Sequence, residues 1–127
     1  MTTDLARFDL AAELEQMRAF PHADAPHHVA KTLVRSQDLR VVLIAMDAGV
    51  DIANHHTDAV ITLQILDGRV SLSCPGSELE LGAGTVTKLD RGVRHALHAI
   101  ERSSVLLSIA WAGHHSRCAA APQEVAA

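Results

Sequence analysis

Residues 60–73 read VITLQILDGRVSLS, and this stretch decides the fold class. Two runs rich in β-branched and aliphatic residues flank Asp67-Gly68, a dipeptide that is a strong signal for a hairpin turn. The first run, residues 60–66, is apolar at nearly every position, whereas a strand exposed on one face would alternate with polar residues. The sequence therefore predicts two antiparallel partner strands, the first of them covered on both faces.

Short runs of the same kind continue on both sides of this hairpin. They are separated by turn signals such as Pro75-Gly76 and Gly82-Ala83-Gly84. Short strands at near-regular spacing indicate an all-β sandwich or barrel. The predicted strands cover residues 31–35, 40–46, 60–66, 69–73, 78–81, 85–89, 94–100 and 104–111.

One short helix is predicted ahead of the strands, at residues 9–19. Asp9 can cap this helix, and Leu10, Leu14 and Met17 recur at helical spacing. A chain of 127 residues has room for one domain. We expect an N-terminal helix and loop at residues 1–29, a barrel at residues 30–115 and a disordered tail at residues 116–127.

The composition argues against several classes of function. The net charge is -4 with histidines neutral, and the aromatic residues are one Trp and two Phe. Nucleic-acid binding needs a basic face or stacking aromatic residues, so we expect no nucleic-acid partner. No apolar run has the length of a membrane span, and the N-terminus lacks the apolar segment of a secretory signal. These features predict a cytoplasmic protein with no membrane partner.

Histidine is the unusual residue type, with nine in the chain. Six occur as adjacent pairs, and a histidine-rich composition can indicate metal binding. His27-His28 and His114-His115 lie in or near predicted loops, where solvated side chains are expected, although they could border a pocket. Cys74 and Cys118 form no CxxC motif and are expected to be free thiols.

Residues 49–99 resemble the two-part motif of the cupin superfamily. The resemblance covers the central half of the chain and includes both parts of the motif. It implies a double-stranded β-helix, or jelly-roll, barrel preceded by the short N-terminal helix. The matching residues are Gly49, His55 and Gly68 in the first part, and Gly84, Gly92 and His95 in the second.

The departures from this motif concern the metal ligands. Thr57 replaces the second histidine, and Ile61 stands at the glutamate position, so only His55 and His95 remain of the four usual ligands. Two imidazoles are too few to hold a divalent transition metal tightly. His56 could add a third ligand if the strand register slips locally. The resemblance therefore implies a weakly bound transition metal or none.

Strand alternation predicts which residues share the barrel interior. If His55 points inward, residues at even spacing along the same strand point inward with it. On the neighbouring strand of the cupin fold, His95 points inward and His98 outward. The predicted ligand pocket consists of His55, Thr57, Ile61, Leu63, His95 and Leu97.

The same alternation places other polar side chains outside the pocket. Gln64 is expected on the outer face, where His56 and His98 could meet. Asp51, Asp58 and Asp90 are interpreted as turn residues. Trp111 is expected to be a packing anchor at the end of the last strand.

The cupin resemblance leaves three functions open, because one fold hosts many activities. The first is a small-molecule-binding or sensing protein. The second is a metal-dependent enzyme of isomerase or dioxygenase type with an atypical ligand set. The third is a metal-free acid–base enzyme that uses His55 and His95.

The two strands that are apolar on both faces also predict a homodimer. Residues 40–46 and 60–66 need cover on their outer faces, and a helix of this length cannot hide both. The contact is expected to use an outer face that includes Val42 and Gln64.

Overall fold

A computed structural model describes residues 5–19, 26–55 and 57–111. Over these ranges the chain forms nine strands and one helix, which confirms the predicted all-β class with a short N-terminal helix. The expected disordered tail and the pair His114-His115 lie outside the described residues. The helix is α1 (Leu10–Ala19), and the strands are β1 (His28–Arg35), β2 (Leu39–Met46), β3 (Asp51–His55), β4 (Val60–Asp67), β5 (Arg69–Cys74), β6 (Ser77–Gly82), β7 (Val86–Leu89), β8 (His95–Ala99) and β9 (Ser103–Ala110).

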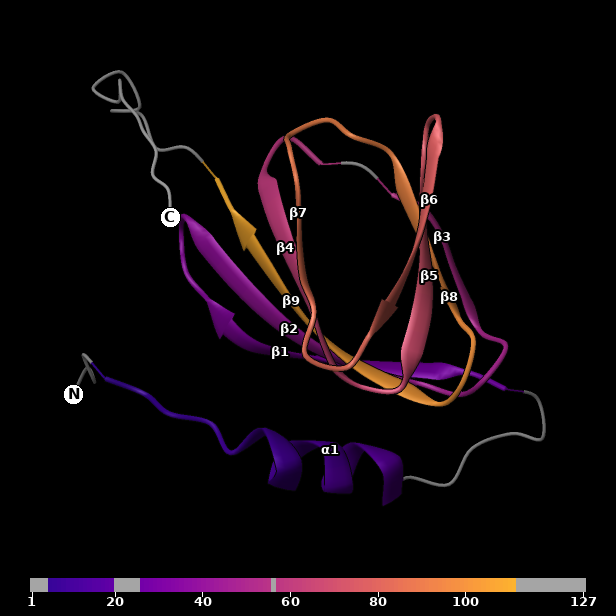
Figure 1. Ribbon diagram of the computed structural model, residues 1–127. Coiled ribbons are helices and arrows are strands. Elements are labelled where there is room, and N and C mark those ends of the chain that lie inside the picture. Colours follow the sequence, from indigo (N-terminus) through magenta and orange to yellow (C-terminus); the bar gives the residue numbers. More distant parts are fainter. Residues whose placement is uncertain (1–4, 20–25, 56, 112–127) are drawn as a thin grey trace.

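The strands form two antiparallel sheets that face each other as a jelly-roll barrel (Figure 1). One sheet has the order β1-β2-β9-β4-β7, and the other has the order β3-β8-β5-β6. From β2 to β5 the chain changes sheet at each step. No helix among the described residues is long and apolar enough to cross a membrane.

The turn at Asp67-Gly68 does not join two paired strands, so the predicted hairpin is wrong. β4 pairs with β7 and β9, whereas β5 pairs with β6 and β8. The turn instead carries the chain from one sheet to the other. A sequence pattern shows that a chain reverses direction, but hydrogen-bonding partners are chosen by the packing of the whole barrel.

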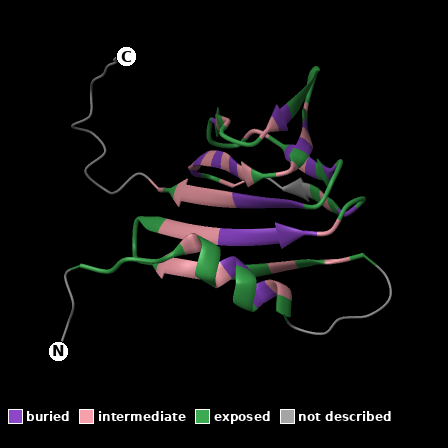
Figure 2. Cartoon of the chain, turned by 60° about the horizontal axis from the view of Figure 1, so that its bottom comes forward, coloured by how far each residue is buried: buried purple, intermediate pink, exposed green. Residues whose placement is uncertain are grey.

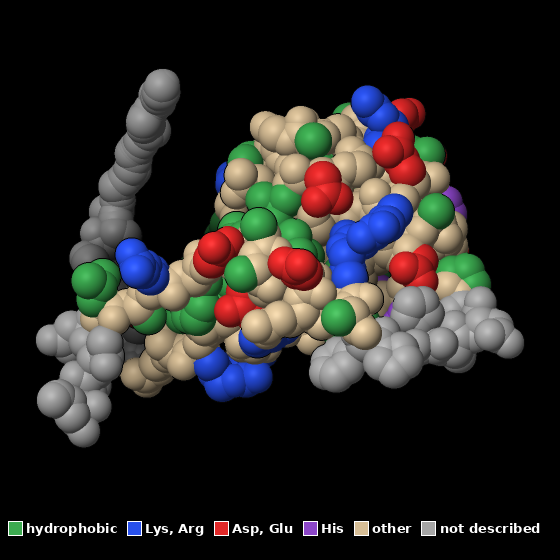
Figure 3. All heavy atoms as spheres, turned by 90° about the horizontal axis from the view of Figure 1, so that it is seen from below, with side chains coloured by type: hydrophobic (Ala, Val, Ile, Leu, Met, Phe, Trp, Pro, Cys, Tyr) green, Lys and Arg blue, Asp and Glu red, His purple; other side chains and the backbone are tan. Residues whose placement is uncertain are grey.

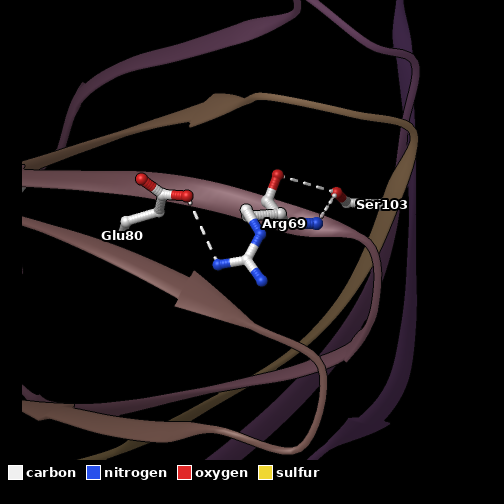
Figure 4. A network of polar contacts seen from close by, with 3 residues as sticks. All are labelled: Arg69, Glu80 and Ser103. Carbon is white, nitrogen blue, oxygen red and sulfur yellow. Dashed lines mark hydrogen bonds and ion pairs between the residues drawn. The ribbon is translucent and has the colours of Figure 1, made fainter.

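The crossing at Gly68 is held by a buried serine at the start of β9. The Ser103 hydroxyl accepts a hydrogen bond from the Arg69 amide at 3.0 Å, and it lies 3.2 Å from the Arg69 carbonyl oxygen (Figure 4). The Arg69 guanidinium turns away toward Glu80, with 3.3 Å between Nη1 and Oε2. Ser103 therefore ties the start of β5 to the sheet that the chain has just left.

The N-terminal helix covers part of the outer face of the five-stranded sheet (Figures 1 and 2). Asp9 caps it, because its Oδ1 accepts a hydrogen bond from the Ala12 amide at 3.1 Å. Leu14 and Met17 are buried against Leu43 and Ala45 of β2. The helix thus covers the second half of β2, at Leu43 and Ala45.

Two expectations about individual residues need correction. Val42 does not share an outer face with Gln64, because Val42 packs against the core between the two sheets. Asp51 is not a turn residue but the first residue of β3, where it pairs in register with His98. β3 was not predicted because its sequence, DIANH, is short and lacks a run of β-forming residues.

Candidate functional site

A cavity of about 290 Å³ lies between the two sheets of the barrel. Its wall is mostly aliphatic, with three polar side chains. Among the described residues that line it, none carries a permanent charge. The lining residues are His28, Ala30, Ile44, Ile52, Thr57, Ile61, Leu63, His95, Leu97, Leu107 and Ile109.

The structure brings together five of the six residues that alternation assigned to the pocket. Thr57, Ile61, Leu63, His95 and Leu97 all line the cavity. The backbone of the sixth, His55, pairs directly with His95 across β3 and β8. The side chain of His55 and the whole of His56 lie outside what the structure describes. That these residues bind a ligand stays a prediction.

His95 is the buried polar group of the cavity, with 8% of its surface exposed. Its Nδ1 lies 3.2 Å from the carbonyl oxygen of Val93. Because a carbonyl oxygen can only accept, Nδ1 carries the proton in this contact and donates it. The hydrogen bond therefore fixes the orientation of the imidazole ring in the wall.

Sequence reasoning missed the contribution of β1 to the cavity. β1 begins at His28, three residues before the predicted strand, so His28 is not a loop residue. His28 and Ala30 both line the cavity although each is exposed, which places them at its mouth. A strand beginning at residue 28 would have identified both by alternation, but Pro26 and the paired histidines favoured a loop.

The donors that the structure describes do not fit a metal centre. No three His, Cys, Asp or Glu side chains within these ranges lie close enough to hold a metal ion. Thr57 offers a hydroxyl and Ile61 offers no donor atom at the positions where the cupin motif has ligands. A metal site at His55, His95 and His56 stays a prediction from the sequence.

A second cavity, of about 170 Å³, lies between α1 and the ends of β1 and β2. It is lined by charged groups, among them Arg18, Asp47 and Arg102. Burial lowers the pKa of the Arg18 guanidinium, and the nearby positive charge of Arg102 lowers it further. Arg18 donates a hydrogen bond to the Ser103 carbonyl at 3.0 Å, which fastens α1 to the sheet. These contacts give this cavity a structural role.

His98 lies outside the barrel, as alternation predicted. Its Nδ1 is 2.8 Å from Oδ1 of Asp51, and 47% and 71% of the two side chains are exposed. A polar contact with this exposure stabilises the fold little. The predicted meeting of His98 with His56 lies outside the described residues.

Comparison with known proteins identifies the fold. No protein-family model matches the sequence, and no curated protein matches it either. Several solved structures have a fold similar to that of this chain. A conserved protein of unknown function from Streptococcus pyogenes is 23% identical over 87% of this chain and 90% of its own, with a TM-score of 0.69. A cupin superfamily protein from Desulfitobacterium hafniense is 15% identical over 72% of this chain and 84% of its own, with a TM-score of 0.67.

Enzymes are also among the similar structures. A DMSP lyase from Ruegeria pomeroyi is 22% identical, covering 65% of this chain and 46% of its own, with a TM-score of 0.61. At these identities the likeness concerns the fold alone. The chain therefore has the cupin fold that its glycine and histidine spacing implied.

Proposed function

We propose that the chain binds a small organic molecule inside the barrel, as a binding or sensing protein. The supporting observation is the cavity of about 290 Å³, with a mostly aliphatic wall interrupted by His28, Thr57 and His95. Apolar walls with a few placed polar groups are typical of small-molecule sites. The apolar wall supplies affinity, and the polar groups orient the ligand.

The volume of the cavity limits the size of its ligand. A cavity of roughly 150 Å³ lined by Leu, Ile and Phe side chains accommodates benzene. The cavity here is about twice as large, at about 290 Å³. It therefore suits a molecule of about a dozen non-hydrogen atoms.

The residues at the ligand positions of the cupin motif favour binding of an organic molecule over metal-dependent catalysis. The position of the motif glutamate is occupied by Ile61, and a lone threonine hydroxyl is a poor ligand for a transition metal. The metal-dependent enzyme and the acid–base enzyme using His55 and His95 stay hypotheses from the sequence. Any metal at His55, His95 and His56 should be weakly held and removable by a chelator without loss of fold.

Titration with 1-octanol, followed by NMR of labelled Ile and Leu methyl groups, tests the binding function. We expect chemical-shift changes at Ile61 and Leu63, which line the cavity. The methyl groups of Leu14, a residue of α1 that is buried against β2 outside the barrel cavity, serve as the internal control and should not shift. Changes confined to Leu14, or no saturable change at all, would contradict the proposal.

We also propose that the chain is a homodimer that uses the outer face of the five-stranded sheet beside α1. The helix buries Leu43, but Leu39 on the same strand stays 37% exposed. Val86, on the edge strand β7, is 58% exposed. Figure 3 shows hydrophobic side chains exposed on the face that carries the helix. Exposed apolar groups on one face of a sheet are suited to contact with a second copy.

Val41→Lys should convert this dimer to a monomer. Val41 pairs in register with Ser108 and has the outward orientation of Leu39 and Leu43. Sedimentation velocity should show a dimer for the wild-type protein and a monomer for the variant. Glu80→Lys, an exposed change on the other sheet, is the matched control and should remain dimeric. A wild-type monomer at micromolar concentration would refute the assembly.

A further inference from the structure

Two arginines line the smaller cavity, of about 170 Å³, that lies outside the barrel beside α1. Arg18 stands in the last turn of α1, and Arg102 directly precedes β9. Arg18 is held in place because its Nη2 donates a hydrogen bond to the Ser103 carbonyl at 3.0 Å. Besides fastening α1 to the sheet, this cavity therefore presents two cationic groups to a small ligand.

The positive charge of this cavity is not balanced by the carboxylates around it. Within residues 5–19, 26–55 and 57–111, neither Arg18 nor Arg102 forms an ion pair with Asp or Glu. Asp47 is the one carboxylate among the described lining residues. Its Oδ2 accepts a hydrogen bond from the His27 amide at 3.1 Å and lies 3.2 Å from His27 Nδ1. This carboxylate is therefore turned toward His27.

The two guanidinium groups repel each other. Burial lowers the pKa of Arg18, and the positive charge of Arg102 lowers it further. Asp67 and Asp47 act in the opposite direction with smaller effects, and Oδ2 of Asp67 accepts a hydrogen bond from the Ser104 hydroxyl at 2.7 Å. Two like charges this close destabilise each other unless an opposite charge lies between them. An anion between the two arginines would remove this repulsion.

We propose that this cavity binds a small, doubly charged inorganic oxyanion of the phosphate type between Arg18 and Arg102. Guanidinium N–H groups bind the oxygens of such an ion in pairs. The contact with Ser103 uses one of the five N–H donors of Arg18, and no nitrogen of Arg18 is both buried and unpaired, so its other donors are accessible. The bound ion would connect α1 to the start of β9.

The size of the cavity limits its ligand to a small ion. A cavity of roughly 150 Å³ accommodates benzene, which has about six non-hydrogen atoms. The cavity here has a similar volume, about 170 Å³, and phosphate is a molecule of similar size. An ester that carries the phosphoryl group on a larger body would extend beyond the cavity.

Methionine methyl groups give a local test of this site. Met17 lines the cavity, whereas Met46 is buried in the core between the two sheets. Phosphate is titrated into protein labelled at the methionine methyl groups and followed by NMR at about pH 8, above the second pKa of phosphate groups. The Met17 signal should shift in a saturable manner, and the Met46 signal should not. Sodium chloride at the same ionic strength controls for screening and should cause no saturable shift.

Three variants test the role of the arginine pair. Arg102→Gln should weaken phosphate binding at least about tenfold, because one of the two guanidinium groups is lost. Arg102 is exposed, so the fold should tolerate this change. Arg102→Lys keeps the charge but not the paired donors, and should retain only part of the affinity. Arg91→Gln removes an exposed arginine between β7 and β8 that does not line the cavity, and should bind phosphate like the wild-type protein.

Phenyl phosphate separates a free ion from a phosphoryl group on a larger molecule. It should bind more weakly than inorganic phosphate, because the cavity has room for only about six non-hydrogen atoms. Tighter binding of phenyl phosphate would overturn the assignment to a free ion. Absence of a saturable shift at Met17, or an unchanged affinity in Arg102→Gln, would overturn the site itself. Each of these results is independent of whether the barrel binds 1-octanol.

Discussion

Gly68→Ala should lower the free energy of unfolding by roughly 4 kcal/mol, at the upper end of the losses caused by single substitutions. Gly68 has a φ of 87°, a backbone conformation that costs an L-residue about 1–2 kcal/mol. An added Cβ would also lie 2.2 Å from the Ser103 hydroxyl and 2.3 Å from the Arg102 carbonyl oxygen. The backbone contact cannot be relieved by rotating a side chain, so β5 or β9 must move. Urea denaturation of the purified protein measures the loss.

Gly49→Ala is the matched control for this substitution. Gly49 has the same φ of 87°, but an added Cβ there meets nothing within 4 Å. Only the conformational term remains, and we expect a loss of about 1 kcal/mol. Equal losses for the two variants would show that the close approach between Gly68 and Ser103 does not constrain the fold.

Ala30→Trp should reduce the affinity for 1-octanol by at least about a hundredfold, or about 2.7 kcal/mol. Ala30 lies on the edge strand β1 and lines the cavity mouth. The indole adds about nine non-hydrogen atoms, which is most of the dozen or so that the cavity can hold. Because Ala30 is exposed, the larger side chain can enter the cavity without displacing a packed neighbour. Calorimetric titration of the variant gives the change in affinity.

The thermal melting temperature separates occlusion of the cavity from unfolding. Ala30→Trp should melt no lower than the wild-type protein, because new apolar contacts replace empty space. Ser73→Trp places the same side chain at an exposed position on the other sheet and should leave the affinity unchanged. Undiminished binding of 1-octanol by Ala30→Trp would show that the ligand site lies elsewhere.

Strand alternation was enough to place most of the cavity residues together. Ile61 and Leu63 lie two apart on β4, and side chains two apart on a strand share a face. Thr57 lies between β3 and β4, which belong to different sheets, so its place in the cavity does not follow from alternation. The burial of His95 and the exposure of His98 follow from the same rule. The resemblance to the cupin motif supplied the remaining step, because it predicted that the strand of His55 and the strand of His95 are neighbours.

Local patterns could not predict which strands pair. The Asp67-Gly68 turn was expected to form a hairpin, yet its two strands lie in different sheets. Asp51 was expected in a turn, yet it forms the first residue of a strand because His98 stands opposite it. In both places the deciding contacts join residues that are distant in the sequence.

The all-β class, the N-terminal helix and the inward face of β4 could be predicted from the sequence, and the resemblance of residues 49–99 to the cupin motif added the cupin fold. The all-β class, the helix and the inward face depend on the two-residue period of a strand, on helical spacing and on turn residues, all of which are local. That His28 and Ala30 form the cavity mouth follows only from the packed barrel. A cavity depends on how distant strands are brought together, and that arrangement is set by the packing of the whole barrel.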